Sequence, residues 1–347
     1  MPKKFLIVGG GIAGNFIAFH LKQAGHEITI IDNGKNQSSR VAAGLINPIV
    51  FRRMAKSWRI DELLEYALTF YAEIEKKTNT KIIKDINIRR LFSSEQECDL
   101  WKQKELDENY SSYLNPLENK DKVYAKTKNQ FGSGRLKQAY HVDAISLFTA
   151  LQKEIWVDGE LVEEAFDYSA LEASELKYKD NYFDGLIFCE GKDLKNNPLF
   201  QEVNVECTKG ELITIHHNYL PQDESVNRKC FVIPLGNNTF KVGATYVWHT
   251  DNDIPTDEGQ AELREMMKYI SDDGFDILDH TAGVRPTTYD RRPFCGEHRS
   301  YKNIYCFNGL GAKGYLLAPL LAKELKDHIL FGTDLNPEVS LYRNTKS

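Results

Sequence analysis

The chain has 347 residues, which exceeds the size at which one hydrophobic core usually stops growing, so we expect two interlocked domains. Hydrophobic residues make up 41% and charged residues 27% of the chain, a composition that excludes disordered and fibrous proteins. The 44 lysines and arginines against 50 aspartates and glutamates give a net charge of −6, which provides no overall attraction for nucleic acids or anionic lipids.

The cysteine and histidine patterns exclude two other classes. The six cysteines are scattered and form no C-x-x-C pair, which is typical of neither a disulfide framework nor a zinc site. His216 and His217 would point to opposite faces of a strand and have no third ligand at motif spacing, so we predict no metal site. The cysteine usage favours a reducing, cytoplasmic compartment.

The first 32 residues predict a β-α-β unit. Residues 5–8 form an apolar run that ends in glycine, residues 12–24 have the pattern of a helix, and residues 27–32 form a second β-branched run. The whole apolar run is unsuited to spanning a membrane because it contains three consecutive glycines together with Asn15 and His20.

The rest of the chain alternates between segments typical of a parallel α/β domain and segments typical of an antiparallel sheet with helices. The predicted elements are a helix at 60–77, strands at 82–92, a charged, loop-rich insertion at 94–138, a helix at 142–153, a buried strand at 183–191, strands at 211–215, 231–234 and 239–247, a helix at 260–270, and a strand, glycine turn and helix at 303–330. This alternation predicts an α/β Rossmann-like domain with a discontinuous, mostly parallel sheet, joined to an α+β domain with an antiparallel sheet.

Three glycines at the first strand-to-helix turn predict a dinucleotide site. Gly9 permits the tight turn, Gly11 lets the backbone approach a pyrophosphate, and Gly14 allows the helix to pack closely on the strand. The helix N-terminus adds free N–H groups for the phosphates. Asp32 lies 18 residues after Gly14 at the end of the second strand, where a carboxylate binds ribose hydroxyls. NAD and FAD both fit this pattern.

Motifs along the whole chain decide between the two cofactors. The chain resembles the D-amino-acid oxidase superfamily of FAD-dependent oxidoreductases, the group that includes glycine oxidase and sarcosine oxidase. It is also similar to the flavin domain of the bifunctional tRNA 5-methylaminomethyl-2-thiouridine enzyme. The segments that carry the resemblance are VGGGIAG at 8–14, SSRVAAGLINP at 38–48, KGELITI at 209–215, FVIPLGNNTFKVGATY at 231–246, AGVRPTTYDRRPFCG at 282–296 and GLGAKGYLLAP at 309–319.

The resemblance implies noncovalently bound FAD, because no cysteine matches the one that tethers flavin in sarcosine oxidases. It implies an FAD-binding domain at 1–80, 139–205 and 283–347, and a substrate domain at 81–138 and 206–282. It also implies that the N-terminus of the last helix faces the N1/O2 edge of the flavin. The implied FAD-binding residues are Gly9, Gly11, Ile12, Ala13, Gly14, Asp32, Asn33, Ser38, Ser39, Ala43, Gly44, Leu45, Val162, Gly191, Gly309, Gly311, Ala312, Lys313, Gly314 and Tyr315.

Three residues are implied at the reacting end. Arg285 matches the arginine that pairs with a substrate carboxylate, and its alternative role is a salt bridge to an acid such as Asp290. Tyr246 places a hydroxyl in the same pocket or packs as an aromatic ring. Lys241 either faces the flavin and promotes oxygen reduction or points to solvent. Lys313, in the second glycine turn, either adds a positive charge next to the flavin or is an exposed loop lysine.

The resemblance implies oxidation of the C–N bond of a small amine or amino acid. Hydride passes to flavin N5, water hydrolyses the resulting imine, and oxygen or another acceptor takes the electrons. Two alternatives remain open at this point. One is oxidative removal of a carboxymethyl group from a modified tRNA wobble uridine, with arginines at 52–53 and 89–90 as a local basic face. The other is an FAD-binding protein without catalysis.

Overall fold

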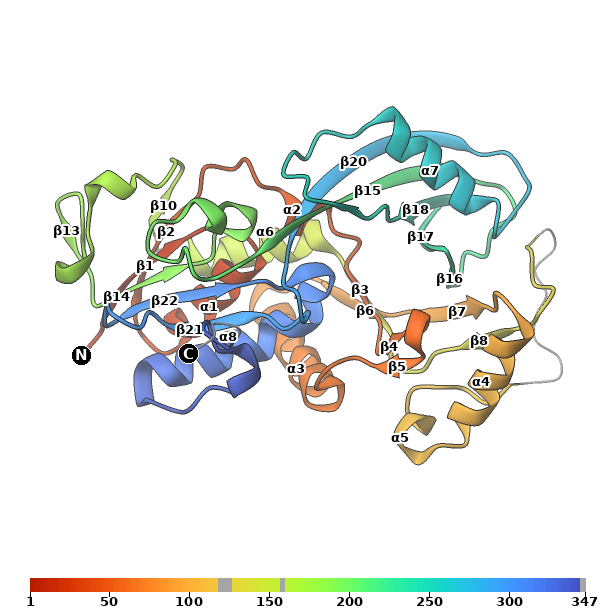
Figure 1. Cartoon of the computed structure of the whole chain (residues 1–347), viewed down its shortest axis with the longest axis horizontal. Coiled ribbons are helices and arrows are strands. Elements are labelled where there is room, and N and C mark those ends of the chain that lie inside the picture. The colour runs from red at the N-terminus through yellow and green to blue at the C-terminus, as the bar shows by residue number, and fades with distance from the viewer. Residues whose placement is uncertain (118–126, 157–159, 344–347) are drawn as a thin grey trace.

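A computed structural model describes residues 1–117, 127–156 and 160–343, and it contains two large sheets. In Figure 1 the first sheet and its helices lie on the left, and the second sheet lies on the right. The first is six-stranded and parallel except for its last strand. Its strands are, in spatial order, β10 (Glu160–Val162), β2 (Glu27–Ile31), β1 (Lys4–Val8), β14 (Gly185–Phe188), β22 (Ile304–Asn308) and β21 (Phe294–Glu297).

Apolar residues cover both faces of this sheet, as expected for parallel strands. Along β1, Phe5 and Ile7 belong to the core shared with the helices, whereas Leu6 and Val8 belong to a separate core on the opposite face. The alternation follows from the two-residue period of a strand. The helices that pack together on the first face are α1 (Ile12–Gln23), α3 (Ile60–Thr78), α6 (Ala144–Ile155) and α8 (Gly314–Phe331).

The second sheet has eight strands and is mostly antiparallel. Helix α7 (Asp257–Met267) packs on one face, where Phe240 and Val242 meet Leu263 and Met267 in a third core. The strands are β19 (Val247–Trp248), β15 (Glu206–His216), β18 (Thr239–Gly243), β17 (Cys230–Gly236), β16 (Glu224–Arg228), β7 (Asn87–Leu91) and β8 (Ser133–Arg135), with β20 (Asp276–Thr287) paired to β15.

Short elements connect the two sheets. In Figure 1 the long strands β15 and β20 run from the second sheet toward the first. The connecting elements are α2 (Ser38–Val41), β3 (Leu45–Ile46), β4 (Ile49–Val50), β5 (Ala55–Lys56), β6 (Ile83–Asp85) and β9 (Tyr140–Val142). Strands β3, β9 and β6 form one small sheet, and β4 and β5 form a hairpin. A further small sheet is formed by β11 (Leu171–Glu172), β12 (Lys177–Tyr178) and β13 (Asn181–Tyr182).

The region expected to be a charged loop contains two helices instead, α4 (Glu95–Glu105) and α5 (Glu108–Ser111). Ser94 begins α4 by accepting a hydrogen bond from the N–H of Glu97 at 3.3 Å. Trp101 is the one buried residue of α4, and Gly134 of β8 lies against its indole. A single buried side chain produces too weak a period for a helix to be recognised in the sequence.

The double arginine at 89–90 lies inside the second sheet and not on a basic surface. The side chain of Arg89 is 3% exposed and that of its ion-pair partner Glu224 is 4% exposed. Arg89 also donates to the Ser133 hydroxyl at 3.1 Å. Arg90 donates to Glu97 and to Asn227, each at 2.7 Å. Both positive charges are therefore compensated within the protein.

We expect Arg89→Ala to lower the free energy of unfolding by about 3–5 kcal/mol, because it leaves the buried Glu224 carboxylate without its cation. Urea denaturation measures this loss. Arg53→Ala, at an exposed position, is the control and should change stability by less than about 0.5 kcal/mol. Equal stability of the two variants would show that the buried ion pair does not stabilise the sheet.

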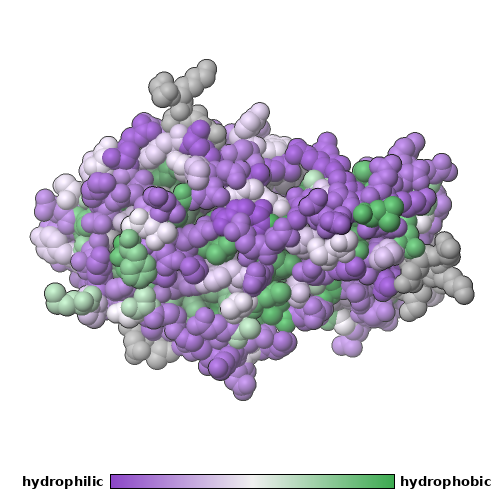
Figure 2. All heavy atoms as spheres, turned by 90° about the horizontal axis from the view of Figure 1, so that it is seen from below, coloured by the Kyte–Doolittle hydropathy of each residue, from purple (hydrophilic) through white to green (hydrophobic). Residues whose placement is uncertain are grey.

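The surface has no obvious large apolar area on the face drawn in Figure 2, where hydrophilic residues predominate and hydrophobic ones form small areas among them. Within the described ranges, no helix is long and apolar enough to span a membrane. The six cysteines are all free thiols, and five of them are buried.

Candidate active site

A cavity of about 580 Å³ lies where the loops of the first sheet meet β15 and β20. Its walls come from stretches that are far apart in the sequence, namely 8–13, 31–33, 36–51, 164–168, 189–196 and 307–316, together with residues of the second sheet. Most residues predicted to bind FAD line this cavity. Those that line it are Gly9, Gly11, Ile12, Ala13, Asp32, Asn33, Ser38, Ser39, Ala43, Gly44, Leu45, Gly191, Gly311, Ala312, Lys313, Gly314 and Tyr315.

The first glycine turn places the N-terminus of α1 against the cavity. Gly9 has φ +106°, and a Cβ on it would overlap the carbonyl oxygen of Cys189 on the neighbouring strand. Gly14 does not line the cavity, but a Cβ there would overlap the carbonyl oxygen of Gly9, so its absence lets α1 approach β1. The N–H of Ile12, at the start of α1, donates to the Ser39 hydroxyl at 3.1 Å.

Asp32 follows β2 and faces the same end of the cavity. Its carboxylate accepts hydrogen bonds from the N–H groups of Gly10 and Gly34, the latter at 2.7 Å, so the glycine turn and the acid fix each other. The N–H of Asp32 donates to the carbonyl of Val162 at 3.1 Å. Val162 itself lies outside the cavity lining, and Glu164, two residues further along, lines it.

The middle of the cavity is formed by small residues. Gly44 has φ +67°, and a Cβ there would overlap the carbonyl oxygen of Val142, so the chain passes β9 only with glycine at this position. The hydroxyl of Tyr315 donates to the carbonyl of Ser39 at 2.6 Å and ties α8 to α2. Ala43 and Leu45 line the wall on either side of Gly44, as expected for a segment that passes close to a planar ring.

The second glycine turn lies at the start of α8. Gly309 has φ +75° and does not line the cavity, and a Cβ there would come within 2.6 Å of the Thr288 methyl group. Gly311 begins a single 3-10 turn that leads into α8 at Gly314. A Cβ on Gly314 would lie 3.4 Å from Ile12 at the start of α1. The two widely separated glycine turns therefore meet at one cavity.

Arg285 lies on β20 and lines the cavity. Its guanidinium covers Gly210 of β15, where a Cβ would overlap it. The Nη1 group lies 3.5 Å from the carbonyl oxygen of Thr245, and the guanidinium carbon lies 5.3 Å from the ring centroid of Tyr246. Burial lowers the pKa of Arg285 below its ordinary value. Within the described part of the chain, no carboxylate forms an ion pair with it.

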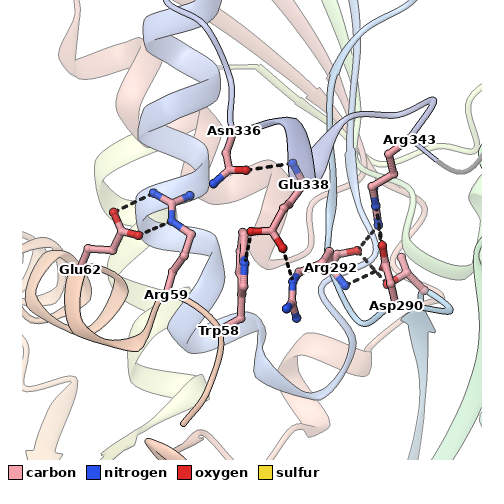
Figure 3. A network of polar contacts seen from close by, with 9 residues as sticks. Trp58, Arg59, Glu62, Asp290, Arg292, Asn336, Glu338 and Arg343 are labelled. Carbon is pink, nitrogen blue, oxygen red and sulfur yellow. Dashed lines mark hydrogen bonds and ion pairs between the residues drawn. The ribbon is translucent and has the colours of Figure 1, made fainter. Parts of the chain in front are cut away.

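Asp290, the acid considered as an alternative partner of Arg285, is bound to Arg343 instead. Figure 3 shows the Arg343 guanidinium at this carboxylate, with nitrogen to oxygen distances of 2.7 and 2.9 Å. Burial raises the pKa of Asp290, but the hydrogen bonds from Arg343 lower it, and the result is a pKa of about 2. In the same figure Glu338 accepts from the indole of Trp58 at 2.8 Å and from Arg292 at 3.3 Å. These contacts fasten the C-terminal segment to the loop before α3.

Two predicted residues lie near the cavity but do not line it. Tyr246 is 42% exposed and packs against Trp248, with ring centroids 5.3 Å apart. Lys241 lies on the face of β18 that is opposite to Phe240 and Val242, whose side chains are buried under α7. This is the face of Gly243, whose strand partner Leu212 lines the cavity. Burial lowers the pKa of Lys241, while Asp279 and Asp143 raise it.

Glu190 lines the cavity and was not predicted from the sequence. It follows β14, so a sequence signal existed, because ligands bind at the carboxyl ends of parallel strands. Its carboxylate accepts from the Tyr168 hydroxyl and from the Asn197 amide, the latter at 2.7 Å. Burial raises the pKa of Glu190 to about 7, although both hydrogen bonds act to lower it.

This raised pKa predicts a pH-dependent stability. Because folding raises the pKa from 4.5 to about 7, the folded protein binds more protons than the unfolded chain within this window. Stability should therefore fall as pH rises from 4.5 to 7, by about 3 kcal/mol in total. In Glu190→Gln this contribution disappears, whereas Glu202→Gln, at an exposed position, keeps it. Urea midpoints between pH 5 and 8 measure the difference, and identical pH profiles for wild type and Glu190→Gln would contradict it.

A family model described as FAD dependent oxidoreductase (DAO) matches residues 4–328. The chain belongs to this family. This oxidoreductase is 24% identical to glycine oxidase of Bacillus licheniformis over 358 residues, which covers 95% of this chain and 94% of the relative. It is 22% identical to the tRNA 5-methylaminomethyl-2-thiouridine biosynthesis bifunctional protein of Acinetobacter baylyi, covering 94% of this chain and 52% of that protein.

The fold of this oxidoreductase matches that of solved flavoenzymes. Glycine oxidase from Geobacillus kaustophilus superposes with a TM-score of 0.82 at 21% sequence identity, covering 99% of this chain and 100% of the other. The two-sheet architecture expected from the sequence is thereby confirmed. The resemblance to the D-amino-acid oxidase family is also confirmed, and the protein is an FAD-dependent enzyme.

The cavity of this oxidoreductase fits FAD. The N-terminus of α1 and the paired turn of Gly9 and Asp32 suit the phosphates and ribose of the adenosine half. The small residues Ala43 and Gly44 in the wall suit the approach of a planar ring, and Arg285 lines the same cavity. No group of His, Cys, Asp and Glu residues within the described ranges is arranged to hold a metal ion.

Proposed function

We propose that this oxidoreductase oxidises the C–N bond of a small amino acid or amine, with Arg285 binding the substrate carboxylate. FAD, held by the glycine turns and Asp32, would supply the acceptor for a hydride from the α carbon at flavin N5. The product is an imine, which water hydrolyses to an oxo compound and ammonia or an amine. The two electrons then pass to oxygen or another acceptor. The names of the relatives, which include glycine oxidases, agree with this substrate class.

The guanidinium of Arg285, which lines the cavity without a carboxylate partner among the described residues, is the observation that carries the proposal. A partly buried cation without an anionic partner is costly, so the site is incomplete until an anion binds. A planar guanidinium holds a carboxylate through two parallel hydrogen bonds and thereby orients the α carbon. Leu212 and Phe231 line the same cavity and give it apolar walls.

Anaerobic reduction of the bound flavin tests the proposal. The purified holoenzyme should lose its yellow colour when a substrate is added without oxygen. A panel of glycine, sarcosine, proline and D-amino acids covers the simplest amine carboxylates. The matching hydroxy acids, which have the carboxylate but no amine, should leave the flavin oxidised. Reduction by the hydroxy acids but by none of the amines would overturn the C–N assignment.

A second candidate is the removal of a carboxymethyl group from a tRNA wobble uridine. The substituent is itself an N-substituted glycine and presents a carboxylate to Arg285. Phe51 lines the cavity, and the next two residues in the chain, Arg52 and Arg53, are exposed cations. If this candidate is right, bulk tRNA binds at ordinary salt and the double variant Arg52→Ala, Arg53→Ala weakens binding. Absence of tRNA binding would exclude it.

A further inference from the structure

Two partly exposed aromatic residues lie beside Arg285 on the second sheet. They are Tyr246 and Trp248, which are 42% and 44% exposed, and we call them the aromatic pair. Their ring centroids are 5.3 Å apart and their planes meet at 70°, so the two rings contact each other edge to face. Trp248 belongs to β19, the strand at one edge of the sheet.

The strand register places the aromatic pair on the sheet face that forms the cavity wall. Trp248 and Arg285 are the direct partners of Thr208 of β15, one on each side of it. Directly paired residues on adjacent strands point to the same face, so Trp248 shares the face of Arg285. Gly210 and Leu212, which follow Thr208 on this face at the two-residue period, line the cavity together with Arg285.

The guanidinium of Arg285 lies between the cavity and the aromatic pair. A Cβ on Gly210 would overlap this group, so the guanidinium covers the bare backbone of β15. Its central carbon is 5.3 Å from the ring centroid of Tyr246. Ala244, two residues before Tyr246, lines the cavity. A carboxylate bound to Arg285 therefore brings the adjoining part of a substrate close to the Tyr246 ring.

The charged residues nearest to Trp248 in the chain already have partners. The Nδ1 atom of His249 lies 3.3 Å from a carboxylate oxygen of Glu206. Asp251 forms an ion pair with Lys195 at 2.5 Å. These pairs offer no free cation to a phosphate, whereas the two rings offer apolar area and π faces to a neutral planar group.

We propose that the substrate is an amino acid with a planar aromatic group on its α carbon or its nitrogen, and that this group packs against the aromatic pair while its carboxylate binds Arg285. The inference rests on the proposed function and names the substrate class of the same site. Single exposed aromatic residues are common, but this pair touches the residue that anchors the carboxylate. Trp248 is then a specificity-determining residue, because a methyl group is too short to reach it.

Binding of carboxylates that have no amine tests the inference without turnover. Phenylacetate has the ring and acetate does not, and the flavin spectrum of the oxidised holoenzyme measures both dissociation constants. Phenylacetate should bind at least tenfold more tightly than acetate, because ring burial adds to the same carboxylate contact. Trp248→Ala should weaken phenylacetate binding about fivefold, the loss of one aromatic contact, and leave acetate binding unchanged.

Matched amines extend the test to catalysis. The pairs are alanine and phenylalanine, each as both enantiomers, and sarcosine and N-benzylglycine. The ring-bearing member of at least one pair should have a kcat/KM at least tenfold higher than its partner. Trp248→Ala should lower only this value, and Trp248→Phe should recover most of it because it retains a ring. Tyr182→Ala, which removes an exposed ring from β13, is the control and should behave like wild type.

A substitution at an edge strand can also disturb folding. If Trp248→Ala does not fold, Trp248→Thr replaces it in both measurements, because a β-branched side chain suits a strand. Circular dichroism and the FAD content of each variant identify a folding defect before any binding constant is compared.

Three results would overturn the inference. The first is a wild type that binds phenylacetate no more tightly than acetate, and the second is a preference for phenylacetate that Trp248→Ala retains in full. The third is loss of tRNA binding in Trp248→Ala without any preference for phenylacetate, which would assign the aromatic pair to an RNA. Failure of the proposed function gives a different pattern, in which phenylacetate binds as expected but none of the amines reduces the flavin.

Discussion

Replacing Arg285 with alanine should reduce kcat/KM for an amino-acid substrate by about thirtyfold to several thousandfold. Removing one partner of a buried, hydrogen-bonded charge pair costs about 2–5 kcal/mol, and each 1.4 kcal/mol corresponds to about a factor of ten. Steady-state kinetics with the best substrate of the amine panel, together with the FAD content of the variant, measure this effect.

Two further variants separate loss of the anchor from general damage. Arg285→Lys keeps the charge but loses the two-pronged geometry, so it should recover only part of the activity. Arg264→Ala removes an exposed arginine from α7 and should behave like wild type. Unchanged kcat/KM in Arg285→Ala, with full FAD content, would show that the substrate carboxylate is bound elsewhere or that the substrate has none.

Gly14→Val should yield a protein that binds FAD at least tenfold more weakly and is purified with little colour. A Cβ at this position would overlap the carbonyl oxygen of Gly9 and lie 3.3 Å from the Ile7 side chain, so α1 must move away from β1. Overpacking of this kind costs about 1–3 kcal/mol. The movement also withdraws the N-terminus of α1 from the phosphates, because its direction depends on contact with the strand.

The FAD dissociation constant from reconstitution of the apoprotein measures this effect, with the absorbance spectrum as the readout. Gly274→Val is the matched control, because a Cβ there meets no atom within 4 Å. It should bind FAD as tightly as wild type. If both variants retain the wild-type affinity, the close contact between α1 and β1 is not required for the cofactor.

Local signals predicted the first glycine turn, which the structure places at the cavity. The spacing of Gly9, Gly11 and Gly14 specifies a turn whose geometry depends on neighbouring residues alone, so its position before a helix could be read from the sequence. The acid at Asp32 follows from the same β-α-β unit. The helix over 95–105 was missed for the opposite reason, since it buries one residue and depends on contacts with β8 for its position.

Side-chain partners at the reacting end could not be predicted. Arg285 and Asp290 are close in sequence, yet the turn after β20 directs Asp290 to Arg343, which comes from the C-terminal segment. The position of Glu190 after a buried strand was a signal for the site, but its hydrogen-bond partners could not be predicted, because acidic side chains are mostly exposed. Its burial depends on Tyr168 and Asn197, which come from other loops.

The amino-acid sequence by itself determined the two-sheet architecture, the FAD family and the glycine turns, because these depend on hydrophobic period and on backbone conformations available to glycine. Only the tertiary structure decided which charges remain without a partner. Arg285 and Lys313 were already candidates from the sequence, and the structure added that distant segments surround both cations and, among the described residues, provide neither with a carboxylate partner, which is a property of packing between segments.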